Sequence, residues 1–160
     1  MDMKHTGSSC EYNDERNRDL MRVFRSVMIS SSNIRLHDIF KIVVNSPSCR
    51  FWVSEKRATV VVNDIVRGRD PLSSMTSNKR EMYIEILSRV MRLMRASPET
   101  TIGEAVAKVV SSPAPKFYLT PDSARIIYYR CRSEWHVRQR LHVLHHARLA
   151  AFWRTRQQQS

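Results

Sequence analysis

Two short segments of the chain place a cation beside two aromatic rings, a pattern that can hold nucleic acid. They are Arg50-Phe51-Trp52 and Lys116-Phe117-Tyr118. Aromatic rings stack on bases while a neighbouring cation holds a phosphate. The alternative is that these rings cover the protein core, which we expect for Phe51 and Phe117. The side chains assigned to nucleic-acid binding are therefore Arg50, Trp52, Lys116 and Tyr118.

The C-terminal part of the chain carries a second group of candidate binding residues. Five of them recur at helical spacing and predict one basic face: Arg125, Tyr129, Arg132, His136 and Arg140. Four more arginines extend the basic region: Arg138, Arg148, Arg154 and Arg156. A helix with such a face can lie in the DNA major groove or along phosphates, with salt-dependent affinity. The alternative is a charged face that only meets solvent.

Three histidines near the C-terminus are candidate metal ligands. His142 and His146 are four residues apart and can share one ion, with His145 beside them. No glutamate follows in a zinc-protease pattern and no cysteine lies near. Basic neighbours, including Arg148, also disfavour a cation. We therefore predict polar surface histidines, no metal site and no cofactor.

No motif of an enzyme is present in the sequence. The chain has no glycine-rich phosphate loop, no paired acidic motif and no nucleophile elbow. We therefore expect a protein without catalytic activity.

Charge favours a polyanion as the binding partner. The formal net charge is +12, with 27 basic and 15 acidic residues. Residues 1–66 are nearly neutral, whereas the later parts of the chain are strongly positive. Such a field attracts nucleic acid first, and acidic membranes or acidic proteins second.

Composition predicts an all-α, cytoplasmic protein. Three glycines are too few for a fold with many tight turns. Three cysteines, an odd number without a Cys-x-x-Cys pair, are typical of free thiols in a reducing compartment. The first residues form no signal peptide, and no apolar run is long enough to span a bilayer.

An internal repeat organises the chain. Residues 46–54 match residues 112–120 at an offset of 66 residues, with serine, proline and phenylalanine identical. The match extends without a gap over 34–66 and 100–132. Apolar residues on both sides of the motif follow helical spacing. We predict two tandem copies of a three-helix unit, loosely resembling a helix-turn-helix, and a long C-terminal helix.

The predicted boundaries follow from this repeat. They are a flexible N-terminus at 1–13, a first three-helix unit at 14–66, a linker at 67–78, a second unit at 79–132 and a basic helical extension at 133–160. Ser54 and Thr120 suit helix N-caps, while Asn78 with Glu81 and Thr101 with Glu104 have capping-box spacing. The prolines make the connections 47–53 and 113–119 non-helical.

The segments 50–58 and 113–121 resemble a family of small basic proteins from Bacteroides-type bacteria and their mobile elements, over about residues 18–140. No activity is established for that family, so the resemblance assigns no functional residue. It implies a mobile-element or phage setting.

Two functions remain open at this point. The first is nucleic-acid binding through the second unit and the C-terminal helix. The second is a protein-interaction or structural adaptor that docks to a partner, or dimerises, through apolar residues of the tail: Trp135, Leu141, Leu144, Phe152 and Trp153. Phosphate binding weakens steeply with salt, whereas apolar docking does not.

Overall fold

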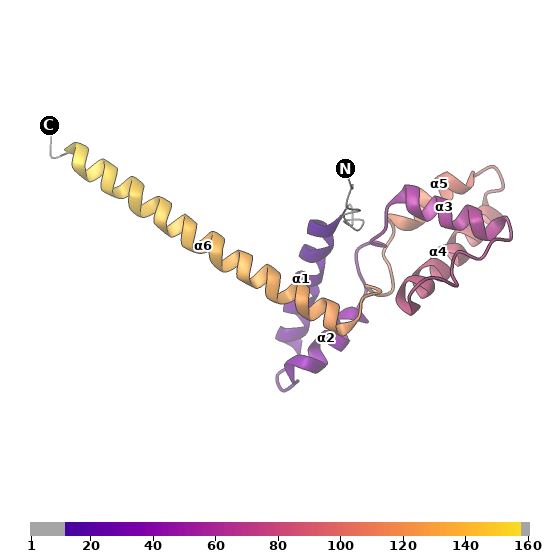
Figure 1. Ribbon diagram of the computed structural model, residues 1–160, viewed down its shortest axis with the longest axis horizontal. Helices are drawn as coiled ribbons and strands as arrows, with labels where there is room; N and C mark the ends of the chain where they lie inside the picture. Colours follow the sequence, from indigo (N-terminus) through magenta and orange to yellow (C-terminus); the bar gives the residue numbers. More distant parts are fainter. Residues whose placement is uncertain (1–11, 158–160) are drawn as a thin grey trace, which may run out of the picture. The chain divides into compact units, whose positions relative to one another are not determined.

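The computed structural model describes residues 12–157, with the side chains of Trp153, Thr155 and Gln157 left out, and this part of the chain is all-helical (Figure 1). The helices are α1 (Asn13–Ser30), α2 (Leu36–Val44), α3 (Glu55–Val66), α4 (Ser77–Ala96), α5 (Ile102–Val110) and α6 (Pro121–Gln157). The all-α prediction is therefore confirmed. Most of the predicted N-terminal segment, 1–13, lies outside the described residues.

Side-chain caps begin three of the helices where the sequence predicted them. The Ser54 hydroxyl accepts a hydrogen bond from the Arg57 amide, 3.2 Å away, at the start of α3. Thr101 and Glu104 form the full capping box of α5. Thr120 accepts the Ser123 amide at 3.1 Å at the start of α6. These bonds satisfy amides that a helix cannot pair internally.

The capping box predicted at Asn78 and Glu81 is wrong. Helix α4 begins at Ser77, with Thr76 as its N-cap and no side-chain cap hydrogen bond. The connection before α4 is therefore two residues shorter than a helix beginning at 79 would require. Glu81 instead forms an ion pair with Lys116, which no local sequence pattern could show.

Helix α3 contains a β-branched run that is also typical of strands. Thr59-Val60-Val61-Val62 lies within α3, as the comparison with the second repeat predicted. Val61 and Val62 are buried, whereas Val60 is exposed. Burial of one helix face outweighs the small intrinsic helix penalty of β-branched residues.

The helices do not pack according to the sequence repeat. Helix α1 packs against α2, but α3 packs against α5 and α4, which belong to the second repeat (Figure 1). One core cluster joins the first connection and α3 to α4 and α5, with Phe51, Val62, Ile86 and Val106 as fully buried members. The first repeat is thus a unit of sequence, while its third helix completes a core built by the second repeat.

The two connections cross where the repeats meet. Ser48 and Ala114 form an isolated antiparallel bridge with two hydrogen bonds, from the Ser48 amide to the Ala114 carbonyl at 3.1 Å and the reverse at 3.0 Å. These two residues occupy equivalent repeat positions, since their numbers differ by 66. The bridge therefore relates the repeats by a local two-fold arrangement.

A second pair of hydrogen bonds repeats this arrangement. The Phe51 amide donates to the Val110 carbonyl at the end of α5, and the Phe117 amide donates to the Val44 carbonyl at the end of α2, at 3.1 and 3.0 Å. The backbone amide of each phenylalanine thus binds the last helical carbonyl of α2 or α5 in the other repeat. The exposed fraction is 0% for Phe51 and 3% for Phe117, which confirms the predicted burial of both rings.

The described chain divides into two compact units, one ending at Ala124 and the other beginning at Arg125. Helix α6 continues from the first into the second. No proline or glycine occurs between Asp122 and Gln157, so nothing in the sequence ends the helix earlier. The predicted continuation of this helix past Cys131 is confirmed.

Candidate nucleic-acid interface

The candidate interface is the part of α6 that begins at Arg125. At about 1.5 Å per residue it amounts to about 50 Å of helix. Every residue from Arg132 to Phe152 is exposed. This part of the helix therefore keeps its side chains in water, where a charged ligand can reach them.

Arginine dominates the charge of this segment. Eight arginines lie between residues 125 and 157, and all of them are exposed: Arg125, Arg130, Arg132, Arg138, Arg140, Arg148, Arg154 and Arg156. The only carboxylate in the same segment is Glu134. Its Oε2 lies 3.9 Å from Arg138 Nη2, and such an exposed pair at that distance neutralises little of the field.

The arginines surround the helix instead of sharing one face. A residue advances by about 100° round an α-helix, so Arg125, Arg132, Arg140 and Arg154 fall within one sector. Tyr129 and His136, which the sequence assigned to that face, fall in the same sector and are exposed. The predicted basic face exists, but it holds only part of the charge.

The other arginines point elsewhere. Arg130 and Arg148 share a second side of the helix because they are separated by five full turns. Arg138 and Arg156 share a third side for the same reason. The sequence analysis added Arg138, Arg148 and Arg156 to the basic region without assigning them a face, and a helix places them on other sides than Arg125.

Exposed apolar side chains lie between these arginines along α6. Trp135, Leu141, Leu144 and Phe152 are all more than half exposed. The side chain of Trp153 lies outside the described residues. Because the apolar groups are spread round the helix, they do not form the broad continuous stripe typical of a helix that packs on a protein core.

The basic–aromatic residue Arg50 is engaged within the protein. Its guanidinium carbon lies 4.1 Å from the centre of the Tyr12 ring and 5.8 Å from that of the half-buried Trp52. Its Nε donates to the Phe51 carbonyl at 3.3 Å. The predicted Arg50–Trp52 pair does exist, but its cation already lies against two rings of the chain.

Lys116 and Tyr118 lie among acidic side chains. Lys116 Nζ is 2.6 Å from Glu81 Oε1, and its side chain is mostly buried. The pKa of the Tyr118 phenol is raised to about 12; burial is the largest cause, the nearby charges of Glu85 and Glu81 add to it, and Arg89 opposes them. Because the Lys116 cation is already paired with a carboxylate, it is poorly placed to hold a phosphate.

The backbone of Tyr118 is unusual. Its φ is +54°, a left-handed conformation that bulky residues rarely adopt. Its ring stacks on Phe51, with centroids 6.1 Å apart and an interplanar angle of 17°. The ring therefore covers the core and has one face occupied, which favours the structural over the base-stacking interpretation of this residue.

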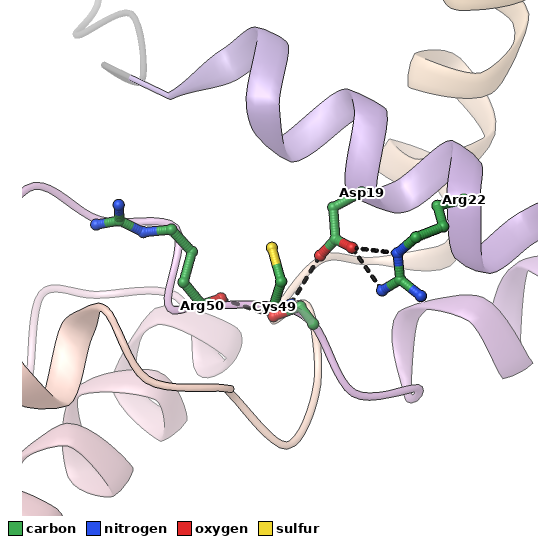
Figure 2. Close-up of polar contacts among 5 residues, drawn as sticks. Asp19, Arg22, Cys49 and Arg50 are labelled. Atoms are coloured by element: carbon green, nitrogen blue, oxygen red, sulfur yellow. Dashed lines mark hydrogen bonds and ion pairs between the residues drawn. The ribbon is translucent and has the colours of Figure 1, made fainter.

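Two polar anchors of the connections were missed by sequence reasoning. In the first repeat, Asp19 of α1 is 6% exposed, accepts the Cys49 amide at 2.9 Å and pairs with Arg22 at 2.6 Å (Figure 2). Figure 2 shows the Asp19 carboxylate between the Arg22 guanidinium and the backbone at Cys49. This buried carboxylate holds the connection to α1.

In the second repeat, a side-chain donor binds a backbone carbonyl of the connection, whereas in the first repeat a side-chain acceptor binds a backbone amide. Position 115, equivalent to Cys49, is a proline and has no amide to donate. Glu85, equivalent to Asp19, binds Arg89 Nε at 2.7 Å, and Arg89 Nη1 donates to the Pro113 carbonyl at 2.7 Å. The equivalence of Asp19 and Glu85 at the repeat offset was the available signal for both anchors.

The surroundings of Cys49 disfavour its thiolate form. Burial is the first cause that raises the pKa of its thiol, and the hydrogen bond and negative charge of Asp19 add to the effect. A raised pKa leaves less thiolate at neutral pH, and the thiolate is the reactive form. Neither Cys49 nor Cys131 forms a disulfide in the part of the chain that the structure describes.

Among residues 12–157, no cluster of three or more histidine, cysteine or acidic side chains is arranged to hold a metal ion. Within the same range, no helix combines the length and the apolar character needed to cross a membrane. Comparison with known proteins found no matching family model, no matching curated protein and no matching solved structure.

Proposed function

We propose that this chain is a non-enzymatic nucleic-acid-binding protein that holds the phosphate backbone through α6 from Arg125 onward. One observation carries the proposal: the exposed helix presents eight arginines against the single carboxylate of Glu134. Each arginine that meets a phosphate releases a condensed counterion, and this entropy gain drives binding that does not depend on sequence.

The distribution of charge supports a helix that lies within a groove. In the B-DNA major groove, which admits an α-helix, phosphates flank the helix on both sides. A helix lying on a flat surface uses cations on one side only. Arginines such as Arg132, Arg148 and Arg138, which point to three different sides, can be used together only when phosphates surround the helix.

The proposed interface excludes the two connections. Arg50, Trp52, Lys116 and Tyr118 have intrachain contacts that binding would have to break. Helix α3, the repeat equivalent of the start of α6, ends at Val66 and has no corresponding basic extension. The proposed activity therefore belongs to α6 alone and is not shared between the repeats.

The adaptor function remains the second candidate because of one observation. Trp135, Leu141 and Phe152 expose 54%, 60% and 57% of their surface, and phosphate contacts give large apolar side chains no role. An acidic protein with an apolar groove would engage both kinds of side chain.

Fluorescence anisotropy at several salt concentrations tests the proposal with generic DNA and RNA oligonucleotides. Replacing Arg132, Arg140 and Arg148 with glutamine should reduce the log-affinity against log-salt slope by about 2–3 units, if each arginine makes one phosphate contact. Glutamine has a helix propensity near that of arginine, so α6 should remain helical.

The matched control replaces three exposed helical arginines outside α6, namely Arg25, Arg92 and Arg95. It removes the same charge, so its slope should stay near that of the unchanged chain. Equal losses from both triple variants would mean that net charge alone drives binding. Absence of binding at low salt would refute nucleic-acid binding and favour the adaptor.

A further inference from the structure

We propose that His142 and His146 of α6 form a binding site for a divalent transition-metal ion that prefers imidazole ligands, such as Zn(II) or Ni(II). The two histidines are one helical turn apart, and both are exposed. Their Nε2 atoms lie 3.1 Å apart and their ring centroids 4.3 Å apart. The two Nε2 atoms therefore lie close enough together for one ion to reach both.

The separation of the nitrogens fits a single ion. With metal–nitrogen bonds of about 2.0–2.1 Å, two atoms 3.1 Å apart subtend an angle of roughly 95–100° at the metal. That angle lies between the square-planar or octahedral value and the tetrahedral one. Both rings can thus bind the same ion while the backbone of α6 stays helical. Water molecules would fill the remaining coordination positions of the ion.

The charges around the pair oppose a cation less than the sequence suggests. Arg148, two residues beyond His146, points to nearly the opposite side of the helix. Arg138, one turn before His142, is the nearest arginine on this side, and it lies 3.9 Å from Glu134. His145 is turned by about 100° from His146, so it is outside the pair although it is adjacent in sequence.

Metal binding would join two successive turns of a helix that is exposed on all sides. Residues 132–152 gain nothing from tertiary burial in this structure, so their helicity depends on local interactions. An ion that binds only the helical conformation shifts the equilibrium toward it by mass action. This inference does not depend on nucleic-acid binding.

Isothermal titration calorimetry of the untagged full chain with Zn(II) and Ni(II) tests the site, with Mg(II) as a hard ion that prefers oxygen ligands. His142→Ala and His146→Ala should each weaken binding of the transition metals by more than about tenfold, since each removes one of two ligands. The matched control, His145→Ala, should leave affinity within about twofold of the unchanged chain.

Circular dichroism provides an independent readout. Addition of Zn(II) or Ni(II) should raise the thermal stability of helix in the unchanged chain and in His145→Ala, but not in His142→Ala. Equal weakening by all three variants, or binding that survives the double variant of His142 and His146, would overturn the proposal. Absence of heat and of any change in helicity would overturn it as well.

Discussion

Phe51 provides a quantitative test of how the two repeats pack. In this packing, which we call the exchange, α3 of the first repeat completes the core of the second repeat. Its ring is fully buried in the cluster that contains Ile86 of α4, and Arg89 lies 5.1 Å from its centre. Full truncation to alanine should cost about 3–5 kcal/mol, a large part of the total stability of a typical domain. Phe51→Leu is therefore the better probe, with an expected cost of about 1–3 kcal/mol from lost apolar area and the cation–π contact.

A double-mutant cycle then locates the side chains around the ring. Ile86 and Leu20 occupy equivalent positions in the two repeats and are both buried. Truncating either to alanine should cost about 2–5 kcal/mol. Because Phe51 shares a core with Ile86, Phe51→Leu and Ile86→Ala should couple by about 0.5–3 kcal/mol, whereas Phe51→Leu and Leu20→Ala should be additive within about 0.5 kcal/mol.

Urea unfolding monitored by circular dichroism gives the four free energies of each cycle, with equal m-values as the check on a common unfolded state. Coupling of Phe51 to Leu20, without coupling to Ile86, would refute the exchange. It would mean that each repeat buries its own phenylalanine.

Three further predictions concern the Asp19 anchor, the cap of α5 and the phenol of Tyr118. Asp19→Ala should destabilise the protein by about 1–3 kcal/mol because it leaves the Cys49 amide without its acceptor; urea unfolding should show a loss that Arg22→Gln, which keeps the acceptor, does not reproduce. Thr101→Ala should cost about 1 kcal/mol by removing the hydroxyl cap of α5, and should lessen the lowering of the Glu104 pKa, because the hydroxyl hydrogen bond is lost while the larger contribution, from the backbone amide of residue 101, remains. Since that pKa is lowered, the linked stability is present above the unfolded pKa and lost as the pH falls through the folded one; acid unfolding of the variant should show a smaller loss over this pH range than the unchanged chain. Tyr118 should ionise near pH 12, later than an ordinary tyrosine near pH 10, and ultraviolet titration of Tyr118→Phe should lack this late step.

The salt-slope test of α6 and the core cycle are independent of each other. The first depends on exposed charge beyond Arg125, and the second on buried side chains before it. Failure of the nucleic-acid proposal would leave the description of the fold unchanged.

Local patterns in the sequence determined much of the secondary structure. Apolar spacing predicted the helices, including α3 with its β-branched run, and the hydroxyls of Ser54, Thr101 and Thr120 form the predicted caps. The repeat match predicted equivalent burial of Phe51 and Phe117. These features depend on residues a few positions apart, so the period and the type of side chain are sufficient to predict them.

The sequence also determined the net charge of the C-terminal segment and, once that segment is a helix, the sides on which its arginines lie. Helical geometry places Arg130 and Arg148 on one side of α6, and Arg138 and Arg156 on another. Selecting positions that share one face could not show how much charge the other sides hold. The surroundings of Lys116 were equally hidden, because Glu81 lies 35 positions earlier in the chain and on another helix.

Only the tertiary structure decided which repeat completes which core. An internal repeat states that two segments are equivalent, and that statement holds whether each copy packs on itself or on the other. Two observations show that α3 of the first repeat packs on the second repeat. Ser48 and Ala114 form a bridge between the two connections, and α3 lies against α4 and α5. The physical reason is that hydrophobic burial is non-directional: an apolar helix face is stabilised by any complementary surface, so its pattern shows that it will be buried and not what will cover it.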